Sequence, residues 1–289
     1  MILVVGSTGL LGGIVTRELL ERDGGESVRV LVRSQDDALP GHAGSVQRVR
    51  GDLMDPDSLL RACEDVDTVV TTANSVSRGG EDTVESVDRR GNRHLIEAAA
   101  RAGVRRFVFV SVLGASPGSP VPFLAAKGET EELLRATDMN WTILEPDAFM
   151  DVWVPAVVGG PALRGDPVVL VGEGSRRHSM IAVRDVAAFT VACLDHPAAE
   201  RETIPLGGPE AISWRDVVGH FSDALGRELE VRTVPLGEGV PGLPPPMQQL
   251  VTGLETYDSV LDMEVISATF GVRQTSLRDF VDHFVRAAA

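Results

Sequence analysis

Several residue types and patterns are scarce in this 289-residue sequence, and each scarcity excludes something. The two cysteines, Cys63 and Cys193, are too few and too far apart to predict a disulfide framework or a metal site. They are typical of a reducing compartment, so we expect a cytoplasmic protein. No apolar run approaches the ~20 residues of a membrane span, and no basic segment precedes the apolar residues that open the chain. We therefore expect neither a membrane anchor nor a signal peptide.

Positive charge is also scarce. The chain has 27 lysines and arginines against 42 aspartates and glutamates, which gives a net charge of −15. Basic residues occur in runs of two at most, so nucleic acid is excluded as a major partner, because phosphate contacts need clustered positive charge. The six histidines are scattered without ligand spacing, and no metal is expected. The sequence also lacks a Gly-x-Ser-x-Gly elbow and a Walker lysine, which excludes hydrolase and ATPase functions.

Lysine is the scarcest of the charged residues. Lys127 is the only one, and the other 26 basic residues are arginines. Codon bias explains such a composition without any function. A chemical need explains it too, because burial can tune an ammonium group to exchange a proton, whereas a guanidinium stays charged.

A glycine-rich stretch opens the chain and carries its strongest motif. Residues 1–13 read MILVVGSTGLLGG: an apolar strand, then glycines at positions 6, 9 and 12, then an apolar helical pattern. A strand that breaks at glycine and restarts as a helix directs backbone N–H groups and the positive end of the helix dipole at one point, which suits a pyrophosphate. An ordinary tight turn is the alternative. The candidate cofactor contacts here are Gly6, Ser7, Thr8, Gly9, Leu10, Leu11 and Gly12.

Strands and helices alternate through the first half of the chain. Six short apolar strands, ending with 141–144, alternate with helical patterns, which predicts an α/β fold with a Rossmann-type, doubly wound parallel sheet. We expect residues 1–150 to form this dinucleotide-binding domain, with 180–197 returning to it. Residues 151–289 are expected to form mostly a smaller C-terminal α/β lobe that binds substrate. Its predicted elements are strands 168–171 and 229–234, helices 214–225 and 277–287, and a loop at 237–246.

Residues that follow the strands are further candidates, because ligands bind at the carboxyl ends of such sheets. Arg33 follows strand 27–32, where an arginine suits the 2′-phosphate of NADP; a solvated arginine is the alternative. Asp52 either accepts a hydrogen bond from adenine or begins the turn that leads to Pro56. Leu53 and the segment Thr72, Ala73 and Asn74 complete this set of predicted cofactor contacts.

With these motifs the sequence resembles the atypical short-chain dehydrogenase/reductases, most closely the NmrA-like, NAD(P)H-binding group. The resemblance spans nearly the whole chain and is more specific for fold and cofactor than for reaction. The matching segments are VVGSTGLLGG at 4–13, VLVRS at 30–34, GDLMDPDSL at 51–59, GNRHLIEAAARAGVRRFVFVSVLGA at 91–115, KGETEELL at 127–134, WTILEP at 141–146, HSMIAVRDVA at 178–187 and FGVRQTSLRDF at 270–280.

Two departures from the superfamily pattern affect the expected chemistry. Standard members carry Tyr-x-x-x-Lys, but here Phe123 stands four residues before Lys127. The usual serine partner falls on Val112, next to Ser111. The resemblance implies that Lys127 holds the nicotinamide ribose, acts as the catalytic acid/base as in isoflavone-reductase-like enzymes, or does both. A surface lysine paired with Glu131 is the structural alternative.

The resemblance also implies a set of residues around the nicotinamide and substrate. Phe149, Met150 and Trp153 are equally well explained as an ordinary interdomain core. For Tyr257, a partly buried structural tyrosine is the favoured interpretation over a hydroxyl in the pocket. His178 is the one histidine with a suspected site role, and Asp185 is expected to anchor the start of a helix. The predicted cofactor contacts are Ser111, Lys127, Pro146, Ala148 and Phe149, and the predicted substrate contacts are Leu113, Phe123, Met150, Trp153 and Tyr257.

Three functions remain open on the sequence. The first is an NADPH-dependent oxidoreductase that reduces a hydrophobic carbonyl, quinone or enone without the usual tyrosine. The second is a non-catalytic NAD(P)(H)-binding sensor or regulatory protein, and the third is a redox-neutral epimerase or dehydratase. We expect NADP(H) as the preferred cofactor, with NAD(H) possible, a small hydrophobic substrate, and a monomer or homodimer.

Overall fold

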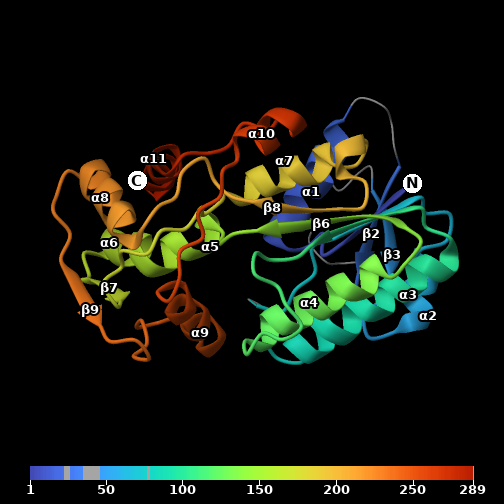
Figure 1. Ribbon diagram of the computed structural model, residues 1–289, viewed down its shortest axis with the longest axis horizontal. Helices are drawn as coiled ribbons and strands as arrows, with labels where there is room; N and C mark the ends of the chain where they lie inside the picture. Colours follow the sequence, from blue (N-terminus) through green and yellow to red (C-terminus); the bar gives the residue numbers. More distant parts are fainter. Residues whose placement is uncertain (23–26, 35–45, 77–78, 289) are drawn as a thin grey trace. The chain divides into compact units, whose positions relative to one another are not determined.

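The computed structural model describes residues 1–22, 27–34, 46–76 and 79–288 (Figure 1). The chain is divided into two compact units. The first comprises Met1–Pro146, Val186–Pro205 and Thr269–Val272. The second comprises Asp147–Asp185, Leu206–Ala268 and Arg273–Ala289. The predicted division at residue 150 and the roles given to the two domains stay predictions.

The first unit is built on a seven-stranded sheet in the order β3-β2-β1-β4-β5-β6-β8. Neighbouring strands from β3 through to β6 pair in parallel, and the order reverses at β1, with β2 on one side and β4 on the other. Such a reversal opens a crevice at the carboxyl ends of the strands. The strands are β1 (Ile2–Val5), β2 (Val28–Val32), β3 (Gln47–Arg50), β4 (Thr68–Thr71), β5 (Arg106–Val110), β6 (Asn140–Pro146) and β8 (Glu202–Leu206).

Helices cover both faces of this sheet. Figure 1 shows α1 and α7 on one face and α2, α3 and α4 on the other. Because both faces are covered, the central strands are near-continuous apolar runs, and every residue of β1 is buried. The predicted doubly wound α/β fold is confirmed. The helices are α1 (Leu10–Glu21), α2 (Pro56–Ala62), α3 (Asn92–Ala102), α4 (Pro122–Arg135) and α7 (Val183–Ala192), with the 3₁₀ turn η3 (Pro197–Ala199).

One predicted helix has an irregular first half. One of the helical patterns that alternate with the strands spans residues 84–102 and predicts one continuous helix, but Val84–Gly91 form a π-helix, η1, and only Asn92–Ala102 continue as α3. At the end of η1 the backbone of Gly91 packs against Leu53, where an added Cβ would lie 2.9 Å from the Leu53 Cβ. Hydrophobic periodicity does not distinguish i→i+5 from i→i+4 bonding over two turns, which is why the sequence missed it.

The second unit has its own apolar core and a two-stranded sheet. Its strands β7 (Val168–Val171) and β9 (Val231–Val234) pair in parallel. Gly159 lies beneath Phe221 and Phe284, where an added Cβ would approach their rings to 2.9 and 2.8 Å. The helices are α5 (Met150–Val154), the π-helix η2 (Pro155–Gly159), α6 (Gly160–Arg164), α8 (Trp214–Leu225), α9 (Pro245–Leu254), α10 (Glu264–Phe270) and α11 (Leu277–Ala288), of which α10 ends in the first unit.

Several of these elements were not predicted. Residues 150–164 form three consecutive helical segments, and α9 begins inside the expected loop 237–246. Proline and glycine at 155, 159, 160 and 161 obscure the helical pattern of the first region, although proline is tolerated in the first turn of each new segment. Among the described residues, no helix combines the length and apolar character needed to cross a membrane.

Candidate dinucleotide site

The glycine-rich turn between β1 and α1 is closed tightly on itself. The Gly9 N–H donates to the Gly6 carbonyl at 3.0 Å, and α1 begins at the next residue. Gly6 has a φ of +92°, and a Cβ there would lie 2.7 Å from the Thr72 Oγ1. A Cβ on Gly12 would lie only 2.2 Å from the Gly6 carbonyl oxygen. These two positions therefore require glycine, one for its backbone angle and both for close packing.

The same turn contains a buried polar atom. Ser7 is 1% exposed, and its Oγ has no hydrogen-bond partner among the described residues. A buried hydroxyl without a partner costs free energy, and such atoms in native proteins call for an explanation. A phosphate oxygen at the N-terminus of α1 would satisfy this hydroxyl and interact favourably with the helix dipole. The turn thus fits a dinucleotide pyrophosphate.

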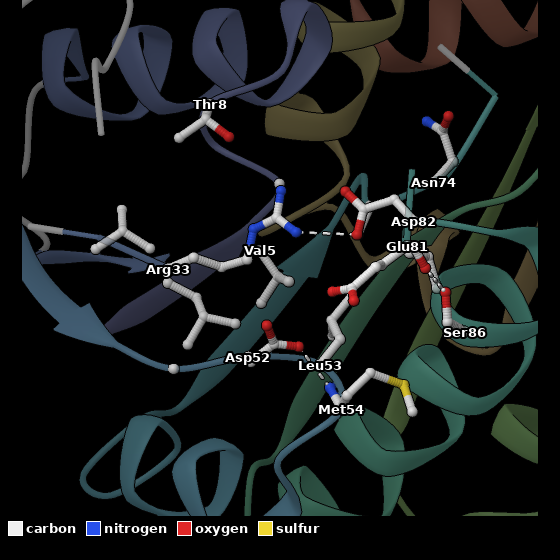
Figure 2. Close-up of a pocket in the computed structure, with 16 residues that line it drawn as sticks. Val5, Thr8, Arg33, Asp52, Leu53, Met54, Asn74, Glu81, Asp82 and Ser86 are labelled. Atoms are coloured by element: carbon white, nitrogen blue, oxygen red, sulfur yellow. Dashed lines mark hydrogen bonds and ion pairs between the residues drawn. The ribbon is translucent and has the colours of Figure 1, made fainter. Parts of the chain in front are cut away.

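A pocket of about 330 Å³ lies beside the turn, at the carboxyl ends of β1, β2, β3 and β4 (Figure 2). Its volume is at the lower end of the range for small-molecule sites, which suits half of a dinucleotide. The described residues that line it are Val5, Gly6, Thr8, Leu31, Val32, Arg33, Gly51, Asp52, Leu53, Met54, Ala73, Asn74, Glu81, Asp82, Ser86 and Val87. The structure therefore brings the predicted contacts from four separate strand ends to one place.

Arg33 lines this pocket and already has an acidic partner. Its Nη1 lies 2.9 Å from the Asp82 Oδ1, and the two side chains are 54% and 17% exposed. Figure 2 shows the Arg33 guanidinium directed at Asp82, with the carboxylates of Glu81 and Asp52 turned toward the same space. The sequence singled out Arg33 but not Asp82, because the two are 49 residues apart and only the fold brings them together.

The side chains of Asp52 and of the segment after β4 make hydrogen bonds to the nearby backbone. The Asp52 Oδ1 accepts from the Met54 N–H at 2.8 Å, which supports the turn interpretation, while the same residue also lines the pocket. Asn74 Oδ1 accepts from the Val76 N–H at 3.1 Å, and Thr72 Oγ1 lies 3.4 Å from the Val5 carbonyl. Direct contacts of these residues with a cofactor stay predictions.

Lys127 lies in the interior of the first unit. Its side chain is 2% exposed, its Nζ donates to the Val110 carbonyl at 3.2 Å, and it lies 3.8 Å from the Asp88 Oδ1. The alternative of a surface lysine is therefore excluded. Asp88 is itself fully buried and accepts from the backbone N–H and hydroxyl of Ser75, at 3.1 and 2.6 Å. This buried pair ties α4 to η1 and to the carboxyl end of β5.

Burial and charge act in opposite directions on this pair. Burial lowers the pKa of Lys127, and the Asp88 carboxylate counteracts this by favouring the ammonium form. Burial likewise raises the pKa of Asp88, against the opposing effects of Lys127 and Ser75. The Lys127 Nζ also lies 4.8 Å from the centre of the Phe109 ring and 5.7 Å from that of Phe123.

Ser111 belongs to a second buried polar group at the carboxyl end of β5. Its hydroxyl donates to the Glu131 carboxylate, whose other oxygen accepts from Arg135 at 3.0 Å. Burial and the neighbouring Glu131 raise the pKa of Glu145 to about 7. Sequence reasoning missed both glutamates, since it considered Glu131 only as a surface partner of Lys127. A raised carboxyl pKa has no signature in residue spacing.

Several predicted substrate contacts lie in or beside the core of the second unit. Met150 and Trp153 on α5 are buried in its apolar cluster, which favours the core alternative for both. Phe149 and Ala148 are half-buried, and Phe149 forms a bridge to Ile181. In the first unit, the Leu113 N–H donates to the Pro146 carbonyl at 2.9 Å, which fixes the backbone after β5. Cofactor contact by Ala148 and Phe149, and substrate contact by Met150, Trp153 and Leu113, stay predictions.

A buried chain of three polar side chains lies beside Tyr257 in the second unit. The Ser259 hydroxyl donates to the Asp147 Oδ2 at 2.7 Å and lies 2.6 Å from the His178 Nδ1. The other ring nitrogen of His178 lies 2.8 Å from the Leu254 carbonyl, so it carries a proton. Tyr257, 46% exposed, packs edge-on against the imidazole with ring centres 5.4 Å apart. His178 is therefore a buried structural residue in this arrangement.

Comparison with known proteins identifies the family. The sequence profile of an NAD(P)H-binding family matches residues 6–197, about two thirds of the chain. The chain belongs to this NAD(P)H-binding family. The match includes the glycine turn, Arg33 and Lys127, and it agrees with the resemblance inferred from the sequence.

Relatives of the NAD(P)H-binding chain differ in their named activities. The chain is 33% identical over 264 residues to an NAD(P)H azoreductase of Xenophilus azovorans, and the alignment covers 91% of this chain and 84% of the relative. It is 31% identical to the photosystem II assembly factor Ycf39 of a Synechocystis strain, covering 81% and 71%. Among solved structures, it resembles an NADPH-dependent quinone oxidoreductase of Escherichia coli complexed with NADPH, with a TM-score of 0.83, 21% identity and coverage of 99% and 100%. That last likeness shows the fold.

Proposed function

We propose that this protein is an NADPH-dependent oxidoreductase that reduces a hydrophobic carbonyl, quinone or enone. The observation that carries the proposal is the glycine turn, with its buried, unpartnered Ser7 hydroxyl, beside a pocket that Arg33 lines. The azoreductase relative and the quinone oxidoreductase fold support the reductase assignment. The cytoplasmic location and a monomeric or dimeric state stay predictions.

The residues present divide into those that would hold a dinucleotide and those that would support its chemistry. Gly6, Ser7 and Gly12 would hold the pyrophosphate, and Arg33 the adenosine 2′-phosphate. When bound, NADPH supplies a hydride to the substrate. At the carboxyl end of β5, Lys127 holds the strand through the Val110 carbonyl, while Ser111 presents a hydroxyl whose hydrogen bond to Glu131 fixes its direction.

Turnover is tested by following NADPH absorbance at 340 nm with a panel of quinones, azo dyes and enones. We expect oxidation with at least one class and its loss in Gly12→Ala, because the added Cβ would lie 2.2 Å from a backbone oxygen of the pyrophosphate turn. Gly219→Ala is the matched control, since a Cβ there meets nothing within 4 Å and turnover should be unchanged. Tight NADPH binding without oxidation of any substrate would refute the oxidoreductase proposal. Product formation without net NADPH loss would indicate a redox-neutral reaction instead.

A second candidate, a dinucleotide-binding protein without turnover, is favoured by one specific observation. The ammonium group of Lys127 is committed to Asp88 and the Val110 carbonyl, and Phe123 occupies the position of the usual proton donor. The Ycf39 relatives, named as assembly factors, support this alternative. It predicts that calorimetry will show unequal affinities for NADPH and NADP⁺ and that a protein partner will co-purify. Equal affinities and no partner would contradict it.

A further inference from the structure

The ion pair between Arg33 and Asp82 lies where the proposed cofactor's 2′-phosphate would bind. Arg33 directly follows β2, and its guanidinium reaches across the pocket to the Asp82 carboxylate at 2.9 Å (Figure 2). Among the described residues that line the pocket, Arg33 is the only cation, whereas Asp52, Glu81 and Asp82 are acidic. Arg33 must therefore leave Asp82, or share itself between two anions, before it can bind a phosphate.

The backbone on both sides of Asp82 is fixed by local hydrogen bonds. The Asp82 N–H donates to the Gly79 carbonyl at 3.3 Å, which closes a turn. On its other side, Thr83 and Ser86 form a capping box at the start of η1, and the Ser86 hydroxyl donates to the Glu81 carbonyl at 2.7 Å. The Asp82 carboxylate is thus presented to the pocket from an ordered position.

We propose that Asp82 is a specificity-determining residue that competes with the adenosine 2′-phosphate for Arg33 and so limits the preference for NADPH over NADH. The inference rests on the proposed NADPH site. A 2′-phosphate carries about −1.5 to −2 charges at neutral pH, so among the described lining residues it is repelled by Asp52, Glu81 and Asp82 and attracted by Arg33. The 2′-hydroxyl of NADH is neutral and donates a hydrogen bond, which a carboxylate accepts. Asp82 therefore disfavours NADPH and tolerates NADH.

Calorimetric titration of Asp82→Asn with NADPH and with NADH tests this competition. Asparagine keeps the size and turn-forming ability of aspartate but removes the negative charge that lies 2.9 Å from the guanidinium. We expect Asp82→Asn to bind NADPH about five-fold more tightly than the wild type does. Partly exposed ion pairs contribute up to about 1 kcal/mol, which corresponds to about a five-fold change in affinity. Affinity for NADH should change by less than about two-fold.

Two further variants separate specific competition from a general change of charge. Glu81→Gln removes one negative charge from the same pocket and the same turn, but Glu81 makes no ion pair to Arg33 in the described structure. It should tighten NADPH binding clearly less than Asp82→Asn does. The second test uses Arg33→Ala, which by itself should lower the affinity for NADPH more than the affinity for NADH. When Asp82→Asn is added to Arg33→Ala, it should have no selective effect on NADPH affinity.

The outcomes distinguish this inference from the proposed function. Dinucleotide binding with an NADPH-to-NADH ratio that is the same in the wild type and in Asp82→Asn would overturn the inference alone. An effect of Glu81→Gln as large as that of Asp82→Asn would also overturn it, because the change would then be general electrostatics. Binding without turnover would leave the inference standing and overturn the oxidoreductase proposal. A wild-type chain that binds neither dinucleotide would overturn both.

Discussion

The buried pair of Lys127 and Asp88 allows a quantitative test of what the chain's single lysine does. The charged atoms are 3.8 Å apart, and at an effective dielectric constant of about 20 their attraction is about 4 kcal/mol. Much of this offsets the cost of removing both charges from water. Removing one partner leaves the other charge buried without compensation, so we expect Lys127→Met to lower the free energy of unfolding by about 3–5 kcal/mol at pH 7.

The double variant Lys127→Met, Asp88→Asn removes both charges and should recover most of this loss. Its free energy of unfolding is expected within about 1 kcal/mol of the wild type, because two neutral groups of similar size need no partner charge. Urea denaturation measures all three proteins. Arg164→Met is the control, since Arg164 pairs with Asp166 at 2.8 Å on the surface and its loss should cost less than about 1 kcal/mol.

The stable double variant also separates structure from catalysis. If Lys127 acts only through Asp88 and the β5 carbonyl, this variant should bind NADPH and oxidise it like the wild type. If Lys127 holds the cofactor's ribose or exchanges a proton, affinity or turnover should fall although the protein is folded. A loss below about 1 kcal/mol in Lys127→Met, or a double variant no more stable than the single one, would refute the account of a buried, mutually dependent pair.

Two other perturbations follow from buried polar groups. Ser259→Ala removes the hydroxyl between His178 and Asp147 and should lower the free energy of unfolding, measured by urea denaturation, by about 2–3 kcal/mol. Ser222→Ala on α8 is the control and should lower it by less than about 1 kcal/mol. Similar losses in the two variants would contradict a stabilising hydrogen-bond network around Ser259. Glu145 has its pKa raised from 4.5 to about 7, so the stability it contributes is present below about pH 4.5 and is lost as pH rises through 7. Because Gln stays neutral and Glu145 is half-exposed, Glu145→Gln should gain about 1 kcal/mol relative to wild type between pH 5 and pH 8; a pH-independent difference would contradict this.

Local patterns predicted the cofactor half of the fold well. Gly6 and Gly12 are specified by backbone sterics, which act between residues a few positions apart and leave a readable spacing. Parallel strands buried on both faces leave continuous apolar runs, so their order along the chain was also readable. Arg33 was predicted for the same reason, since its place depends only on where β2 ends.

The features that the sequence did not predict depend on contacts between distant residues. Asp82 meets Arg33 across 49 positions, and Lys127 meets Asp88 across 39, so no spacing rule connects either pair. The sequence does not reveal the π-helix η1 either, yet this helix buries Asp88 and follows the turn that carries Asp82. One irregular segment therefore influences both the predicted phosphate contact and the predicted catalytic lysine.

This shared dependence on η1 bears on whether the protein is an enzyme or a binding protein. Asp82 immediately precedes the Thr83 cap of η1, and Asp88 lies within it, so a small displacement of this segment would alter the acidic partner of Arg33 and that of Lys127 together. In the arrangement described here both cations are paired with carboxylates. An enzyme needs Lys127, or the neighbouring Ser111, available at the carboxyl end of β5, whereas a binding protein needs only the glycine turn and Arg33. Loss of turnover with unchanged NADPH affinity in the double variant of Lys127 and Asp88 would therefore assign the lysine to the reaction and support the enzyme.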